Sequence, residues 1–302
     1  MPQRLGHTLL LAVAACLILV RPAVAEAPSV FVTIKPIHGL AAGVMAGVAK
    51  PYLLITGGGS PHHRTLKPSA ARQLARADLV VWIGDRLETF MQRPIAALAS
   101  AKAVVELQSL PDLIRWPARE LDDWHHTDND ADVDPHLWLD PRNAERIVAH
   151  LAERLGRIDP ANATRYRANA QAMGIRLRDL DQSLQARLAP YKNKPFILFH
   201  DGYQYFERRY GLASIGAVAL SPERPSGARH LTAIRRRIAE TGATCLFTEP
   251  QFPPAMARRL AEDTALQIGQ LDPLGADLVP GPDSYFALMD NLVRDLVTCL
   301  GR

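Results

Sequence analysis

The sequence predicts an α/β protein with two lobes, each built on a parallel sheet, joined by one long helix. Short apolar segments rich in β-branched residues alternate with helical segments along the chain. These apolar segments do not alternate with polar residues, which is typical of strands covered by helices on both faces. Between two such regions, residues 159–189 form a segment of high helix propensity, about 30 residues long.

The first region contains the strands and helices of the predicted N-terminal lobe, residues 26–158. The expected strands are 29–34, 51–56, 78–84 and 103–107, and the expected helices are 39–48, 67–77, 86–100 and 144–159. Between Arg119 and Asp134 the chain carries seven carboxylates and one arginine, with little that packs. We therefore expect an acidic surface loop there.

The predicted linking helix covers residues 159–189, and residues 190–302 form the predicted C-terminal lobe. Asp159 is suited to the N-cap of this helix and Pro160 to its first position. After the helix, strands are expected at 195–200, 212–220, 243–249 and 266–272, and helices at 201–211, 228–242, 253–265 and 284–300.

Residues 1–25 have the features of a secretory signal. Arg4 precedes an apolar run, and Ala23-Val24-Ala25 fits a cleavage site. A membrane anchor would need about 20 apolar residues, more than this run supplies. Acylation at Cys16 is the other alternative, but the apolar run continues past Cys16, which favours cleavage after Ala25. The predicted protein is exported, and loss of the signal lowers its net charge from +4 to +2, giving no reason to expect a nucleic-acid partner.

Cys245 and Cys299 remain after signal removal. Two thiols in an exported chain suggest a disulfide, and the long loop that it would close corresponds to roughly 4 kcal/mol of stabilisation. Two buried free thiols are the alternative.

Three histidines and one aspartate occupy the same kind of position, at or just beyond an expected strand end. Ligand sites of open α/β sheets collect at the carboxyl ends of the strands. Three imidazoles and a carboxylate suit tetrahedral zinc, whereas manganese prefers a set richer in carboxylates. A metal site is therefore expected in the cleft between the lobes. The four residues are His62 in "TGGGSPHHRTLKPS", His136 in "DPHLWLD", His200 in "PFILFH" and Asp272 in "QLDPLGAD".

The motifs "GSPHHRTLKPS", "DPHLWLDP", "FHDGYQYFE", "TEPQF" and "LDPLG" together resemble the periplasmic solute-binding proteins of zinc ABC transporters. The resemblance covers essentially the whole mature chain and implies two α/β lobes joined by a rigid helix. It places the metal ligands on His62, rather than His63, and on His136 and His200. Asp272 is the fourth ligand by the pattern of several relatives, while in others a glutamate or a water completes the site. The resemblance also implies a disulfide in the second lobe, which fits Cys245 and Cys299.

The resemblance implies capture of Zn²⁺ in the periplasm and its delivery to an inner-membrane ABC permease with a cytoplasmic ATPase, by a monomer that is not an enzyme. Many zinc-binding members carry a His-rich loop, whereas this loop is short and acidic and holds only His125 and His126. It is either a metal-collecting segment or a solvated linker. The alternative functions are a manganese or iron carrier of the same fold, a zinc hydrolase with Glu249 as base, and an adhesin-like surface protein.

Overall fold

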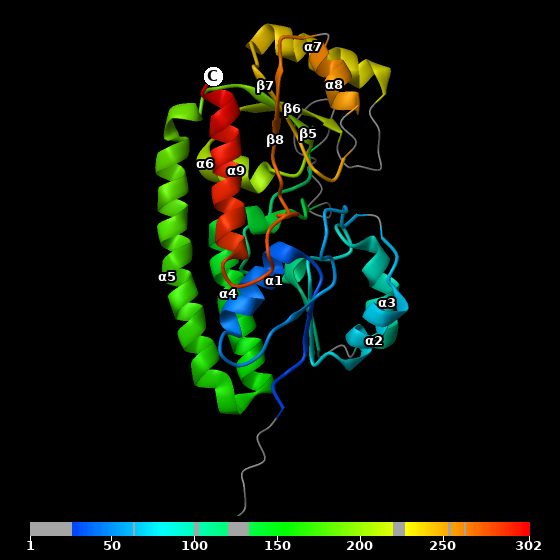
Figure 1. Ribbon diagram of the computed structural model, residues 1–302, viewed down its shortest axis with the longest axis vertical. Coiled ribbons are helices and arrows are strands. Elements are labelled where there is room, and N and C mark those ends of the chain that lie inside the picture. Colours follow the sequence, from blue (N-terminus) through cyan, green and yellow to red (C-terminus); the bar gives the residue numbers. More distant parts are fainter. Residues whose placement is uncertain are drawn as a thin grey trace, which may run out of the picture.

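Two four-stranded parallel sheets form the two lobes of the computed structural model, which describes residues 26–62, 64–99, 103–119, 133–219, 227–252, 255–262 and 264–302 (Figure 1). The first sheet has the order β2-β1-β3-β4 and the second the order β6-β5-β7-β8. The predicted fold class is thus confirmed. The strands are β1 (Val30–Val32), β2 (Tyr52–Leu53), β3 (Leu79–Trp82), β4 (Val104–Glu106), β5 (Phe196–His200), β6 (Ser214–Ala219), β7 (Cys245–Thr248) and β8 (Gln267–Gln270).

In the N-terminal lobe the central strands β1 and β3 are fully buried, as their unbroken apolar sequences predict. Three helices accompany them: α1 (Lys35–Val44), α2 (Pro68–Arg76) and α3 (Gln92–Leu98). The helix expected over 86–100 is shorter, because the Glu88 carboxylate accepts hydrogen bonds from the amides of Ile83 and Gly84 and holds a turn there. A 3₁₀ turn follows, and Pro94 then lies in the first turn of α3, where its missing N–H costs nothing.

Three helices form a layer along one side of both lobes: α4 (Pro141–Ile158), α5 (Ala163–Leu188) and α9 (Ser284–Leu300). Figure 1 shows α5 running beside both lobes, and it packs against α1 of the first lobe and α6 and α9 of the second. This is the predicted linking helix, flanked by the 3₁₀ turns Pro160–Asn162 and Ala189–Tyr191.

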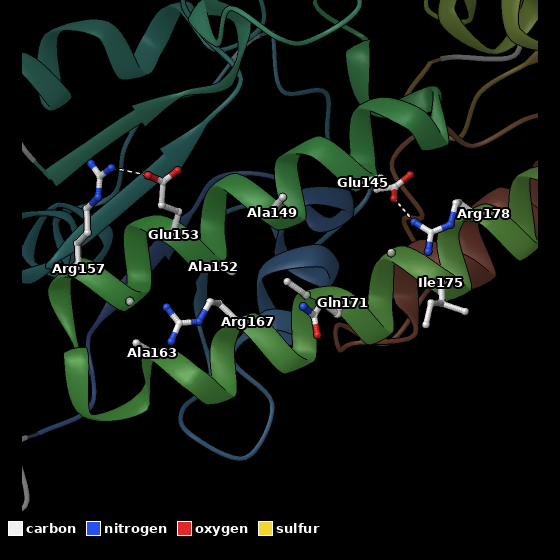
Figure 2. A pocket seen from close by; sticks show the side chains of 13 residues that line it. Glu145, Ala149, Ala152, Glu153, Arg157, Ala163, Arg167, Gln171, Ile175 and Arg178 are labelled. Carbon is white, nitrogen blue, oxygen red and sulfur yellow. Dashed lines mark hydrogen bonds and ion pairs between the residues drawn. The ribbon is translucent and has the colours of Figure 1, made fainter.

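An open groove of about 800 Å³ lies between α4 and α5, and small side chains of both helices form part of its lining (Figure 2). Its rim carries two ion pairs, Arg157 with Glu153 and Arg178 with Glu145. The groove contains no histidine, so it is separate from the predicted metal site.

In the C-terminal lobe β5 is buried along its whole length and ends at His200. The helices are α6 (Gln204–Tyr210), α7 (Ala228–Thr241) and α8 (Ala255–Glu262), with Gly211 ending α6 in a left-handed conformation at φ 66°. The predicted disulfide is confirmed: Cys245 of β7 is bonded to Cys299 of α9. Among the helices in the described part of the chain, none is long and apolar enough to cross a membrane.

Candidate metal centre

The structure gathers three of the four predicted ligands between the lobes. His62 lies in the loop after β2, His136 immediately precedes a 3₁₀ turn, and His200 ends β5. Their ring centroids are 5.0–5.9 Å apart, and one ring nitrogen of each lies within 4.8 Å of the others. Nitrogens bound to one tetrahedral zinc at about 2.05 Å are roughly 3.4 Å apart, so a shift of about 1 Å would complete a site.

The space between the rings suits a single small ligand. The cavity measures about 10 Å³, close to the smallest volume that holds one water molecule. His136 and His200 are 4% and 3% exposed, while His62 is half-buried. Trp138 packs beside His136 and Phe252 beside His200, at centroid distances of 5.3 and 5.6 Å. The imidazoles share the lining of this cavity with these apolar side chains and with the polar side chains of Ser60, Glu249 and Gln251.

Two buried carboxylates orient two of the rings. Asp134 Oδ1 lies 2.8 Å from His136 Nδ1, and Glu249 Oε1 lies 3.0 Å from His200 Nδ1. When a carboxylate engages Nδ1, the other ring nitrogen, Nε2, is left to bind metal, a pairing common at zinc sites. In the described part of the chain, His200 Nε2 is buried and has no hydrogen-bond partner.

The same carboxylates alter the proton affinity of the site. Burial alone would lower the pKa of His200, but the charge and hydrogen bond of Glu249, together with the charges of Asp201 and Asp134, outweigh it and raise that pKa above its ordinary value. For Asp134, burial would raise the pKa, yet the hydrogen bond to His136 lowers it below the usual range. A divalent cation therefore meets a charged Asp134 carboxylate that is already aligned behind His136.

Asp272 is not part of the histidine cluster, contrary to its expected place. Its carboxylate accepts hydrogen bonds from Gln251 Nε2 at 3.0 Å and from the amides of Leu274, Gly275 and Ala276. A strand-end position brings a residue to the correct edge of the sheet, but here the unpaired amides of the next turn engage both carboxylate oxygens.

The turn that holds Asp272 is fastened to the opposite lobe. Lys35 Nζ, at the start of α1, donates to the carbonyl oxygens of Gly275, Ala276 and Leu278 at 2.6, 2.6 and 2.9 Å. Trp138 Nε1 donates to Pro273 O at 2.9 Å. Burial lowers the pKa of Lys35. These bonds fix the turn next to His136 and account for the fixed direction of the aspartate.

Gly202 is a site residue that the sequence analysis missed. A Cβ atom at this position would lie 2.7 Å from His200 Cε1 and 3.2 Å from His136 Nε2. Only glycine fits between the two rings at this spacing. Asp134 was also missed, although the Asp-Pro-His spacing at 134–136 was available as a signal, and Glu249 was considered only as a catalytic base. Three further histidines considered above, His63, His125 and His126, lie outside the described residues, as do the signal peptide and Cys16.

Two α/β lobes with three converging histidines between them define a two-lobed binding protein with a metal site at the lobe interface. The profile of the family described as "Zinc-uptake complex component A periplasmic" (ZnuA) matches residues 30–299. Because this match covers most of the chain, the chain belongs to the ZnuA family.

Two curated relatives are similar over nearly their whole length. The high-affinity zinc uptake system protein ZnuA of Brucella suis biovar 1 (strain 1330) is 37% identical, covering 92% of this chain and 93% of that protein. The protein of the same name from Yersinia pestis is 32% identical, covering 95% and 96%.

Solved structures share the fold. The periplasmic zinc-binding protein TroA from Treponema pallidum has a TM-score of 0.79 at 24% identity, covering 91% of this chain and 99% of that one. A ZnuA crystal structure has a TM-score of 0.77 at 24% identity, covering 91% and 100%. FpvC from Pseudomonas aeruginosa, solved with Mn²⁺, has a TM-score of 0.78 at 21% identity, covering 91% and 99%.

Proposed function

We propose that this protein captures Zn²⁺ in the periplasm and delivers it to the inner-membrane permease of an ABC transporter driven by a cytoplasmic ATPase. The observation that carries the proposal is the convergence of His62, His136 and His200 on one small cavity. Curated relatives more than 30% identical are named for high-affinity zinc uptake. We further propose that the protein acts as an exported monomer, cleaved after Ala25 and without a lipid on Cys16.

The donor set favours zinc over manganese or iron. Neutral imidazole nitrogen is a good ligand for zinc, whereas manganese prefers carboxylate, carbonyl and water oxygen. In competition titrations of metal-stripped protein, we expect Zn²⁺ to displace Mn²⁺ completely at equal concentrations, with one zinc bound per chain. A tighter manganese complex would instead support a manganese carrier of the same fold.

For the fourth position we propose a water molecule in place of Asp272. Three of the described bonds of the aspartate hold its own turn and a fourth comes from Gln251, and a single oxygen donor suffices to complete three imidazoles into a tetrahedral site. The substitution Asp272→Asn should then change zinc affinity by less than about threefold, since Asn retains an acceptor oxygen in the place of Oδ1, which accepts most of the bonds described above. Calorimetric zinc titration of both proteins measures this.

A loss of roughly a hundredfold or more in the Asp272→Asn titration would show that the aspartate turns to bind the ion. Such a loss corresponds to about 2.7 kcal/mol, well above the net contribution of about 1 kcal/mol from one ordinary hydrogen bond of the turn. Asp290→Asn, which removes a carboxylate of α9 from an exposed ion pair with Arg187, is the control for loss of an aspartate charge outside the site.

The hydrolase alternative is disfavoured by the place of Glu249. This carboxylate is 4% exposed and is bonded to Nδ1 of His200, so it orients a ligand rather than activating a water molecule. Non-catalytic capture is therefore the function that we propose.

A further inference from the structure

A buried ion cluster joins the two lobes directly behind the metal centre. Arg119, from the first lobe, donates from Nε to Asp201 Oδ2 at 3.1 Å and from Nη1 and Nη2 to the two oxygens of Glu207 at 2.8 and 2.9 Å. Nη2 also bonds to Asp201 Oδ1. The three side chains are 5–7% exposed. One guanidinium thus holds two carboxylates of the second lobe in a planar fork.

The second-lobe end of this cluster is attached to a ligand. Asp201 follows His200 directly in the chain, so the fork fixes the backbone immediately after that histidine. Glu207 belongs to α6, and Ser214 of β6 donates to its carboxylate as well. The guanidinium therefore holds the end of β5 in a fixed position relative to α6.

The first-lobe end is attached to the other buried ligand. Pro117 forms a β-bridge with Val133. Pro117 lies two residues before Arg119, and Val133 lies three residues before His136. Gln204 of α6 donates both to Pro117 O and to Asp134 Oδ2, each at 3.0 Å. Asp134 in turn holds the ring of His136. The segment that carries His136 is thus bonded to α6 through Gln204. The segment that carries His200 is bonded to α6 through Arg119, which contacts both Asp201 and Glu207.

A cluster of this kind contributes to alignment more than to stability. Two carboxylates and one guanidinium lose their hydration on burial, which offsets much of their mutual attraction. What the fork supplies is geometry, because the planar guanidinium bonds to two carboxylates only in a narrow range of positions.

We propose that Arg119 is a positioning residue for zinc capture, holding the chain after His200 against the segment that carries His136 so that both imidazoles are aligned before the ion arrives. This inference rests on the proposed zinc-binding function. It assigns to Arg119 a role that depends on the shape of its side chain as well as on its charge.

The test compares Arg119→Lys with Arg209→Lys. Lysine keeps the buried charge, so both proteins are expected to fold, but it lacks the fork. Arg209 forms a comparable bidentate pair with Asp181 of α5, in which neither residue contacts a ligand histidine. The measurements are zinc affinity by competition titration and the visible spectrum of bound Co²⁺, whose band intensity reports coordination geometry.

We expect Arg119→Lys to weaken zinc binding about tenfold and to change the Co²⁺ spectrum, and Arg209→Lys to leave both at wild-type values. Wild-type affinity and spectrum in Arg119→Lys would overturn the inference. Should that variant lack a folded circular dichroism spectrum, Asp201→Asn is measured in its place, with the same two outcomes. Absence of zinc binding in the unmodified protein would contradict the proposed function itself, which separates the two failures.

Discussion

The substitution Gly202→Ala is expected to weaken zinc binding by roughly 10- to 100-fold. The new methyl group would lie 2.7 Å from one carbon of the His200 ring and 2.9 Å from Nδ1, the atom that faces Glu249. Overpacking of this kind costs about 1–3 kcal/mol, and here the cost falls on the geometry of the ligands. Because Glu249 and Asp134 hold the two rings, neither ring can turn away without losing its carboxylate. Isothermal titration with zinc measures the change.

The matched control for this substitution is Gly227→Ala. Gly227 precedes α7 at φ −71° and ψ 162°, which alanine adopts without strain, and a Cβ there meets no atom within 4 Å. Its zinc affinity should equal that of the unmodified protein. If Gly202→Ala also retained full affinity, the close packing of the two rings would not be needed for binding.

Zinc binding should weaken in acid, and Glu249 should set the pH at which this begins. Zinc binds the neutral imidazole, so protons compete once the pH falls through the pKa of a ligand histidine. Glu249 raises the pKa of His200, so competition begins at a higher pH than for an isolated imidazole. In Glu249→Gln, burial without the carboxylate lowers that pKa, and the acid limb of the affinity curve should move to lower pH. Competition titrations between pH 8 and 5 measure both curves.

At neutral pH the same variant should bind zinc about 10- to 100-fold more weakly, since loss of a carboxylate behind a ligand histidine has effects of this size. Glu145→Gln removes a carboxylate from an exposed pair with Arg178 and serves as the control. Curves of Glu249→Gln and wild type that run parallel across the whole range would contradict the role of Glu249.

The sequence was sufficient for the fold and for the place of the histidines. Buried parallel strands have a recognisable pattern, and strand ends of such sheets meet at one edge, so His200 at the end of β5 was predictable. The direction in which a side chain points at such a strand end was not predictable from the sequence. Asp272 occupies an equivalent position, yet the amides of its own turn hold its carboxylate. The sequence positions of Glu249 and Gly202 also do not indicate that Glu249 bonds to His200 or that Gly202 lies between the rings of His200 and His136.

The helix over 86–100 differs for a reason that was present in the sequence. Pro94 is compatible with a first turn but not with the interior of a helix, so α3 begins at Gln92. The turn that precedes α3 depends on the buried hydrogen bonds from the amides of Ile83 and Gly84 to Glu88, and the sequence does not indicate this contact.

The long helix α5 limits how far the two lobes can move relative to each other when the metal site is filled. One continuous helix contacts elements of both lobes, and a helix bends little over its length, so a large rotation of the lobes is costly. We therefore expect zinc binding to change the structure locally, around the half-buried His62 and residues 57–60 beside it, and to leave the overall outline of the protein unchanged.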